Sequence, residues 1–300
     1  SGKVVAMIAA TGGREAMIAL AVNEKARLGE AEMTSMLERH GTDGEVREAL
    51  LCRTEIPAPV RAMIATQTAR ALEVFTINTG LLSAQRSERC TREARDSATI
   101  EIAAQEYART GNPPVQLANK LRESSQLTPS LLLRSLVCGE RSLFEASLES
   151  LTGAGTRRIA GLVSAWSGTG FAALYTKAGL PPRLLGAFRA AIAAQDATGL
   201  IHDSEQPPTL SSLLIERTLA ACEASSSPDL RTVNALLHRL RAEAMRNKAR
   251  LLSLELIADA KSALQIEAAG TSTPVLTGQP AIDLQAIEEA VQQPTAVLAA

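Results

Sequence analysis

The stretch LTPSLLLRSLVCGERSLFEASLESLTGAGTRRIAGLVSAWSGTGFAALYTKAGLPPRLLGAFRAAIAA, residues 127–194, reveals most about the architecture of this chain. It is a run of short amphipathic segments at helical spacing, opened by a Thr-Pro, a Pro-Pro or glycine-rich turns. Proline is tolerated in the first turn of a helix and disfavoured in its interior, so each proline marks a start. Five of the seven aromatic residues lie here, namely Phe144, Trp166, Phe171, Tyr175 and Phe188. The stretch therefore predicts a packed series of short helices.

Segments with helical spacing, separated by turns, also occur before and after residues 127–194. Helical spacing runs over residues 14–39, with a break near Gly29, and again over 86–109 and 211–222. Asp43 is a candidate cap for a helix that ends before the turn Ile56-Pro57-Ala58-Pro59, and another helix starts at about Val60. No window alternates as a strand would. We expect an all-α fold, an irregular helical-repeat array of the HEAT or armadillo kind with a long C-terminal helix.

The long C-terminal helix is predicted from about residue 230 to 266, where no proline or glycine interrupts the pattern. Apolar residues recur at alternating spacings of three and four, with Asn247 as one polar member, as in a heptad seam. The seam comprises Leu230, Val233, Leu237, Leu240, Ala244, Asn247, Leu251, Leu254 and Ala258. Two interpretations are open: the seam packs on the body of the protein, or residues 230–258 form a homodimer or bind a partner helix.

Three regions follow from these patterns. Residues 1–202 form the helical-repeat domain, and residues 203–267 form a C-terminal helical region that contains the long helix. Residues 268–300 are expected to be a flexible acidic tail, since no Lys or Arg follows Lys261. A short amphipathic turn from Leu284 to Val291 lies within that tail.

Composition excludes several classes of protein. The net charge is −1 and only 2% of residues are aromatic, so neither a global basic field nor a stacking platform for nucleic acid is expected. No stretch of about 18 apolar residues could cross a membrane. The start SGKVVAMIAATGG is too weak for a signal peptide, and Ser1-Gly2 looks like a processed start.

The four cysteines, Cys52, Cys90, Cys138 and Cys222, lie far apart and are expected to be buried, reduced thiols. We therefore predict a cytoplasmic protein.

The segments LTPSLLLRSLVCGERSLFEASLESLTG and ALYTKAGLPPRLLGAFRAAI resemble the bacterial, mainly alphaproteobacterial, family called domain of unknown function 2336. Members share the forms L-T-P-x-L-L-L-R-x-L and L-Y-x-K-A-G-L-P. The earlier unit REALLCRTEIPAPVRAMIA is similar to the helical repeats of that family, so the resemblance covers roughly residues 40–200. It implies a helical fold throughout and supplies no catalytic residue.

The glycine-rich turn Gly153-Ala154-Gly155-Thr156-Arg157-Arg158 is a candidate site for an anionic or nucleotide ligand. Backbone N–H groups at a helix start attract anions, and Arg157 and Arg158 stand beside them. Lys177 and Arg183 are further candidates, although a lysine just before Gly179 also suits the last turn of a helix. The alternative is a plain loop in which Thr156 caps the next helix.

Basic residues on the long helix are candidate partner-binding residues: Arg239, Arg241, Arg246, Lys248 and Arg250. They could equally form a solvated face, because the stems of Arg and Lys cover helix seams well. Binding of nucleic acid here is not expected.

Neither a catalytic set nor a metal site emerges from the sequence. The three histidines are scattered, the cysteines form no C-x-x-C pair, and no P-loop or nucleophile elbow is present. We expect no cofactor. The sequence favours a non-catalytic scaffold that binds or regulates a protein partner, with a small-ligand sensor at residues 153–158 as the alternative.

Overall fold

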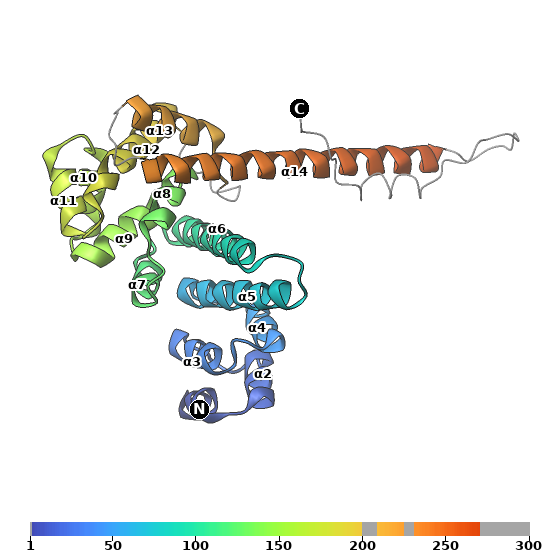
Figure 1. Ribbon diagram of the computed structural model, residues 1–300. Coiled ribbons are helices and arrows are strands. Elements are labelled where there is room, and N and C mark those ends of the chain that lie inside the picture. Colours follow the sequence, from blue (N-terminus) through green and yellow to red (C-terminus); the bar gives the residue numbers. More distant parts are fainter. Residues whose placement is uncertain (1, 200–208, 225–230, 271–300) are drawn as a thin grey trace, which may run out of the picture. The chain divides into compact units, whose positions relative to one another are not determined.

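A computed structural model describes residues 2–199, 209–224 and 231–270, and within them every regular element is helical (Figure 1). The all-α prediction is confirmed. The helices are α1 (Gly2–Thr11), α2 (Arg14–Val22), α3 (Glu30–His40), α4 (Gly44–Leu51), α5 (Ala58–Asn78), α6 (Ala84–Thr110), α7 (Val115–Glu123), α8 (Pro129–Val137), α9 (Ser142–Thr152), α10 (Thr156–Ser164), α11 (Thr169–Lys177), the 3₁₀ turn η1 (Pro182–Leu184), α12 (Leu185–Thr198), α13 (Ser212–Ala224) and α14 (Arg231–Gly270).

Local chemistry sets these boundaries. The Thr128 hydroxyl accepts a hydrogen bond from the Leu131 N–H at 3.2 Å and so caps α8 just before Pro129. Asp43 caps α4, as predicted, by accepting from the Glu45 N–H at 2.9 Å. Gly111 ends α6 at φ +67°, a left-handed conformation that glycine adopts without steric cost.

The helices pack in an alternating order. Each odd-numbered helix from α1 to α9 contacts the next odd-numbered helix, up to α11, while α2 packs on α4 and α5 packs on α6. Figure 1 shows α3, α5 and α6 lying one above another in the blue-to-green part of the chain. Stacked helix pairs produce this order. The HEAT- or armadillo-like repeat is a prediction with which these contacts agree.

The aromatic residues of the segment 127–194 form the centre of the largest core. The Phe144 and Phe188 rings stack with centroids 5.4 Å apart, and the Tyr175 ring lies 5.4 Å from that of Phe188. The buried Tyr175 also donates its hydroxyl to the Pro181 carbonyl at 3.0 Å. Aromatic pairs of this kind add to the free energy of area burial, so the segment that resembles the family is the hydrophobic centre of α8–α12.

A buried ion pair joins three helices around this core. Arg134 of α8 is 4% exposed and Glu243 of α14 is 8% exposed. Arg134 Nη1 donates to Glu243 Oε2 at 2.9 Å, and Nη2 donates both to Glu243 Oε1 and to Ser97 Oγ of α6 at 2.7 Å. Burial lowers the pKa of Arg134, but the hydrogen bond and charge of Glu243 outweigh it and the pKa is raised. The pair fixes α14 against α6 and α8.

The predicted seam of the long helix has a buried first half and an exposed second half. Val233, Leu237, Leu240 and Ala244 are buried in the largest core, which fits the interpretation that the seam packs on the body of the protein. Asn247 is exposed, and Leu251 and Leu254 are each 53% exposed. The chain also divides after Asn247 into two compact units, Ser1–Asn247 and Lys248–Ala300. Only the first half of the predicted seam is therefore used within the body.

Several sequence-based expectations need correction. The segment Gly2–Thr11, which we had considered only as a weak signal sequence, is helix α1 with Ala9 buried. Of the four free cysteines, Cys138 and Cys222 are buried as predicted, but Cys52 and Cys90 are exposed because they lie on outward faces near a helix end and on α6. The boundary near residue 203, the tail beyond 270 and the turn Leu284–Val291 lie outside the described residues.

None of the described helices is long and apolar enough to cross a membrane.

Replacing Arg134 with Met should destabilise the protein by about 3–5 kcal/mol, because Glu243 is then left buried without a partner. The double variant Arg134→Met/Glu243→Met should lose less than the Arg134→Met variant alone. The control is Arg241→Met, whose exposed partner Glu216 lies 3.5 Å away and whose loss should cost at most about 1 kcal/mol. Urea unfolding followed by helical circular dichroism measures all three. A double variant that loses as much stability as Arg134→Met, or more, would contradict the coupling.

Candidate functional site

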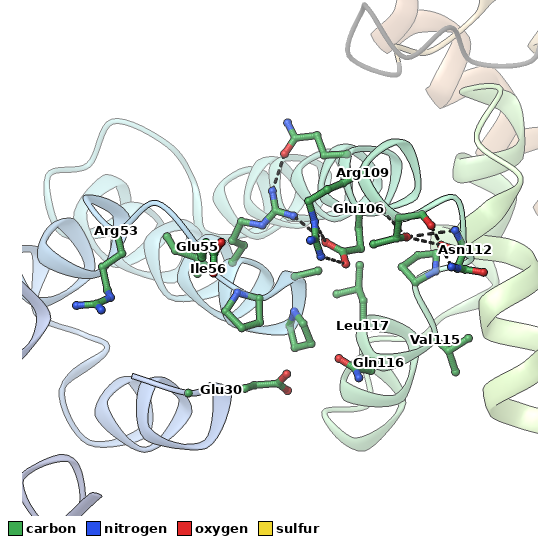
Figure 2. Close-up of a pocket in the computed structure, with 18 of the residues that line it drawn as sticks. Glu30, Arg53, Glu55, Ile56, Glu106, Arg109, Asn112, Val115, Gln116 and Leu117 are labelled. Carbon is green, nitrogen blue, oxygen red and sulfur yellow. Dashed lines mark hydrogen bonds and ion pairs between the residues drawn. The ribbon is translucent and has the colours of Figure 1, made fainter. Parts of the chain in front are cut away.

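A groove of about 1230 Å³ lies between the α4–α5 turn and the α6–α7 turn (Figure 2). Its apolar lining comes from prolines and branched side chains on both sides. These residues are Leu28, Leu51, Ile56, Pro57, Pro59, Pro113, Pro114, Val115 and Leu117. The groove thus combines an apolar surface with the polar groups of α3, α5 and α6.

A three-residue charge cluster lines the α5 and α6 side of the groove. Glu106 lies between two guanidiniums: Arg109 Nη2 is 2.6 Å from Glu106 Oε1, and Arg61 Nη2 is 3.6 Å from Glu106 Oε2. Arg61 Nη1 donates to Gln105 Oε1 at 2.6 Å, and its buried Nε finds no partner among the described residues. Two positive charges therefore share one carboxylate.

The pKa values of Arg61 and Arg109 are both shifted by their surroundings. Its pKa is lowered mainly by burial, with Glu106 acting to raise it and Arg109 acting to lower it further. Arg109 is exposed, and its hydrogen bond to Glu106 raises its pKa. Within this cluster two guanidiniums face one carboxylate, although the whole lining holds three arginines and three glutamates. A carboxylate from a ligand would be attracted by the local excess beside Arg61 and Arg109.

The first turns of α3, α5 and α7 all line this groove. Gly29 and Glu30 precede and open α3, Pro57 and Ala58 open α5, and Pro114 and Val115 open α7. No side chain caps α5 or α7. Helix starts carry partial positive charge, so the two uncapped ends add to the attraction of the groove for carbonyl and carboxylate oxygens.

Glu30, Glu55 and Arg53 add three charged residues to the lining. Figure 2 shows Glu30 and Gln116 across the opening from Glu106 and Arg109. Arg53 is held by the backbone: its guanidinium donates to the carbonyls of Ala21, Asn23 and Ala26 at 2.7–3.2 Å. Arg53 therefore ties the α2–α3 turn to the end of α4 and has little capacity left for a ligand.

The glycine-rich turn at 153–158 lies elsewhere, between α9 and α10. Gly153 is the left-handed C-cap of α9 at φ +67°, and Gly155 is the N-cap of α10. The Thr156 hydroxyl does not cap α10; it donates to Glu149 Oε2 at 2.6 Å. The interpretation of Thr156 as a cap was wrong, because Gly155 is one residue earlier at the cap position. The Glu149 carboxylate beside the turn opposes an anion there.

The other predicted ligand residues are not gathered into one site. Arg157 and Arg158 are exposed in the first turn of α10, Lys177 is exposed in the last turn of α11, and Arg183 is exposed in η1. None of the seven predicted ligand residues lines the groove.

The predicted partner-binding residues of α14 separate into three groups. Arg239 and Arg246 line a second, smaller cavity with residues of α6. Arg241 points to Glu216 of α13 instead. Lys248 and Arg250 are exposed and belong to the second unit, Lys248–Ala300.

Sequence reasoning missed the groove although its signal was present. The turn containing Pro57 and Pro59 and the pair Pro113–Pro114 were interpreted only as breaks between helices. Both precede helices that start at the same groove, and Arg61 follows one of them by a single turn. Within the described residues, no three His, Cys, Asp or Glu side chains gather in a way that could hold a metal.

The chain belongs to a family of uncharacterised proteins conserved in bacteria, domain of unknown function 2336 (DUF2336), whose profile matches residues 1–227. The match confirms the resemblance seen in the segment 127–194 and extends it over α1 to α13. No curated protein and no solved structure matches the chain.

We expect glycine to be needed at position 153 because of its backbone conformation and not because a ligand binds there. Gly153→Ala should lose about 1 kcal/mol of stability, because a side chain at φ +67° is strained although nothing lies within 4 Å of the added Cβ. Gly161→Ala, inside α10 and equally open, is the control and should lose no stability, because alanine is favoured over glycine within a helix. Thermal unfolding of both variants measures the difference, and equal effects would contradict it.

Proposed function

We propose that this protein is a non-catalytic interaction protein, a regulatory scaffold of the cytoplasm, and that the groove binds an extended segment of a partner protein. The segment would present an acidic side chain beside apolar ones. The observation that carries the proposal is the cluster of Arg61, Glu106 and Arg109, in which two guanidiniums share one carboxylate at an apolar groove.

The size of the groove favours a peptide over a small ligand. Its volume of about 1230 Å³ exceeds the roughly 300–1,000 Å³ of pockets that enclose small molecules. The proline-rich sides suit the side chains of an extended chain, and the uncapped starts of α5 and α7 suit its carbonyls. A carboxylate from the partner would meet Arg61 and Arg109.

The lining offers little for covalent chemistry, which supports a binding function. No histidine, cysteine or lysine is among the described residues of the groove. The buried thiols are also unreactive, since burial raises the pKa of Cys138 to about 12 and that of Cys222 to about 11. Free cysteines of this kind are typical of a reducing compartment, which supports the cytoplasmic assignment.

Selection of a random peptide library against the full chain tests this proposal. Enriched peptides should carry Asp or Glu next to apolar residues. Arg109→Glu should weaken their binding by about tenfold or more, equivalent to about 1.4 kcal/mol, because it replaces an attraction by a repulsion. Fluorescence polarisation with a labelled peptide measures the change.

The matched control is Arg92→Glu on the same helix. Arg92 is exposed and pairs with Glu88 at 2.6 Å, as Arg109 pairs with Glu106, but it does not line the groove. Its replacement should leave peptide binding unchanged. Peptides that bind equally well to the Arg109→Glu protein would argue against the groove as the binding site.

We also infer that the exposed half of the α14 seam pairs with a second copy of this chain. Leu251 and Leu254 occupy successive seam positions and are exposed. With this register, Arg250 and Glu255 flank the seam, and in a parallel pair Arg250 of one copy faces Glu255 of the other. The exposed seam and its complementary charges support a homodimer within residues 230–258.

Replacing both Leu251 and Leu254 with Glu should convert this dimer to a monomer, because four acidic side chains would meet at the seam. Light scattering after size-exclusion chromatography measures the mass. The control is Leu256→Glu, since Leu256 is 69% exposed but lies off the seam. A wild-type protein that is monomeric at high concentration would exclude the dimer.

A further inference from the structure

A second cavity, of about 330 Å³, lies between α6 and α14. Its lining is strongly basic: Arg86 and Arg89 come from α6, and Arg239 and Arg246 come from α14. Cys90, Glu93 and Ala242 complete it. We call this cavity the arginine cleft. It lies in the unit Ser1–Asn247 and shares no lining residue with the groove.

The helical spacing explains why these arginines meet. On α6, Arg86, Arg89 and Glu93 lie three and four residues apart and so share one face. On α14, Arg239, Ala242 and Arg246 have the same spacing. The two faces meet across a small residue, Ala242, which leaves room for the cavity between the long side chains.

The buried ion pair holds the two faces together. Glu243 lies between Arg239 and Arg246 in the sequence and is turned inward to Arg134, which also binds Ser97 of α6. Leu240 and Ala244, on either side of it, are buried. Burial of Leu240, Glu243 and Ala244 therefore orients α14 so that Arg239 and Arg246 line the cavity together with the arginines of α6.

The arginines of the cleft lack the ion pairs that their neighbours have. Within the described part of the chain, Arg92 pairs with Glu88 and Arg241 pairs with Glu216, whereas no carboxylate pairs with Arg86, Arg89 or Arg246. Arg239 uses only Nε, toward the Ala235 carbonyl at 3.3 Å. Glu93 is the one carboxylate in the lining, so the cleft carries a net charge of about +3.

The four arginines are exposed, and guanidiniums that line one cavity attract an anion placed between them. The planar guanidinium fork matches the oxygens of a phosphate in paired hydrogen bonds, and several arginines match a group with two or more charges. A cavity of this size has room for one or two phosphoryl groups and a small attached moiety. The lining has no aromatic side chain on which a nucleobase could stack.

We propose that the arginine cleft binds the phosphoryl group of a small phosphorylated molecule, with Arg86, Arg89, Arg239 and Arg246 as its donors. The geometry makes α14 part of the site, so binding would also stabilise the contact of α14 with α6. The site is independent of the groove and of the partner segment proposed for it.

Titration calorimetry with inorganic pyrophosphate, at about 0.15 M salt to screen unspecific attraction, tests the proposal. One pyrophosphate should bind per chain. The variant Arg86→Ala/Arg239→Ala should weaken binding by about tenfold or more, since it removes one donor from each helix. The control Arg92→Ala/Arg241→Ala removes the same number of charges from the same two helices outside the cleft, and it should change affinity by less than about twofold. Equal weakening by both double variants would overturn the proposal.

Cys90 provides a second measurement that uses the unmodified protein. Its exposed thiol lines the cleft, whereas Cys52 is exposed but not part of the cleft lining. Pyrophosphate should slow alkylation of Cys90 severalfold and leave Cys52 unchanged. Unchanged alkylation of Cys90 at saturating pyrophosphate would overturn the assignment of the site. Tight binding of single-stranded DNA with no binding of pyrophosphate would overturn the proposed ligand.

Discussion

The ion pair between Arg134 and Glu243 is the contact on which the arrangement of the last helix depends. Taking two charges out of water is costly, and their attraction repays that cost only when the geometry is close and further hydrogen bonds are made. Here Arg134 uses both terminal nitrogens on Glu243 and a further bond on Ser97, so one guanidinium joins α6, α8 and α14. Such a contact tolerates little displacement, because a shift of any of the three helices would leave a charge buried without its partner. Arg134 belongs to the Leu-Leu-Leu-Arg segment by which the chain resembles its family, which gives that segment a structural role beyond its apolar residues.

Much of the fold could be predicted from the sequence, because it is set by local chemistry. Prolines, glycines and capping side chains act within a few residues of themselves, and they correctly located α4, α5 and α8. Helix α1 was missed because Gly2–Thr11 is short, lacks acidic residues in its first turn and buries only Ala9. The ion pair could not have been found in this way, since Arg134 and Glu243 are 109 residues apart. In the sequence Glu243 lies among the basic residues of the long helix, whereas in the structure it is buried against Arg134.

The candidate sites were harder to predict, for the same reason. A glycine-rich turn followed by two arginines is conspicuous in the sequence, yet Gly153 serves a helix end and Glu149 lies beside Thr156. The groove and the arginine cleft are each assembled from segments far apart in the chain. Their members are ordinary in isolation: a proline turn, an arginine on a helix, a glutamate one turn before a helix end. Arg61 gains its neighbours through the packing of α5 on α6. Arg239 gains its neighbours where α14 and α6 line one cavity.

Helix α6 is common to both sites. Its first third contributes Arg86 and Arg89 to the arginine cleft, and its last third contributes Glu106 and Arg109 to the groove. Its middle is buried at Asp96, Thr99 and Ile100. The two sites lie roughly 25 Å apart along this helix at 1.5 Å per residue. An anion bound in the cleft would therefore contact the same helix that lines the groove. Any resulting change in affinity must be reciprocal, so a partner bound in the groove would alter the affinity of the cleft by the same factor.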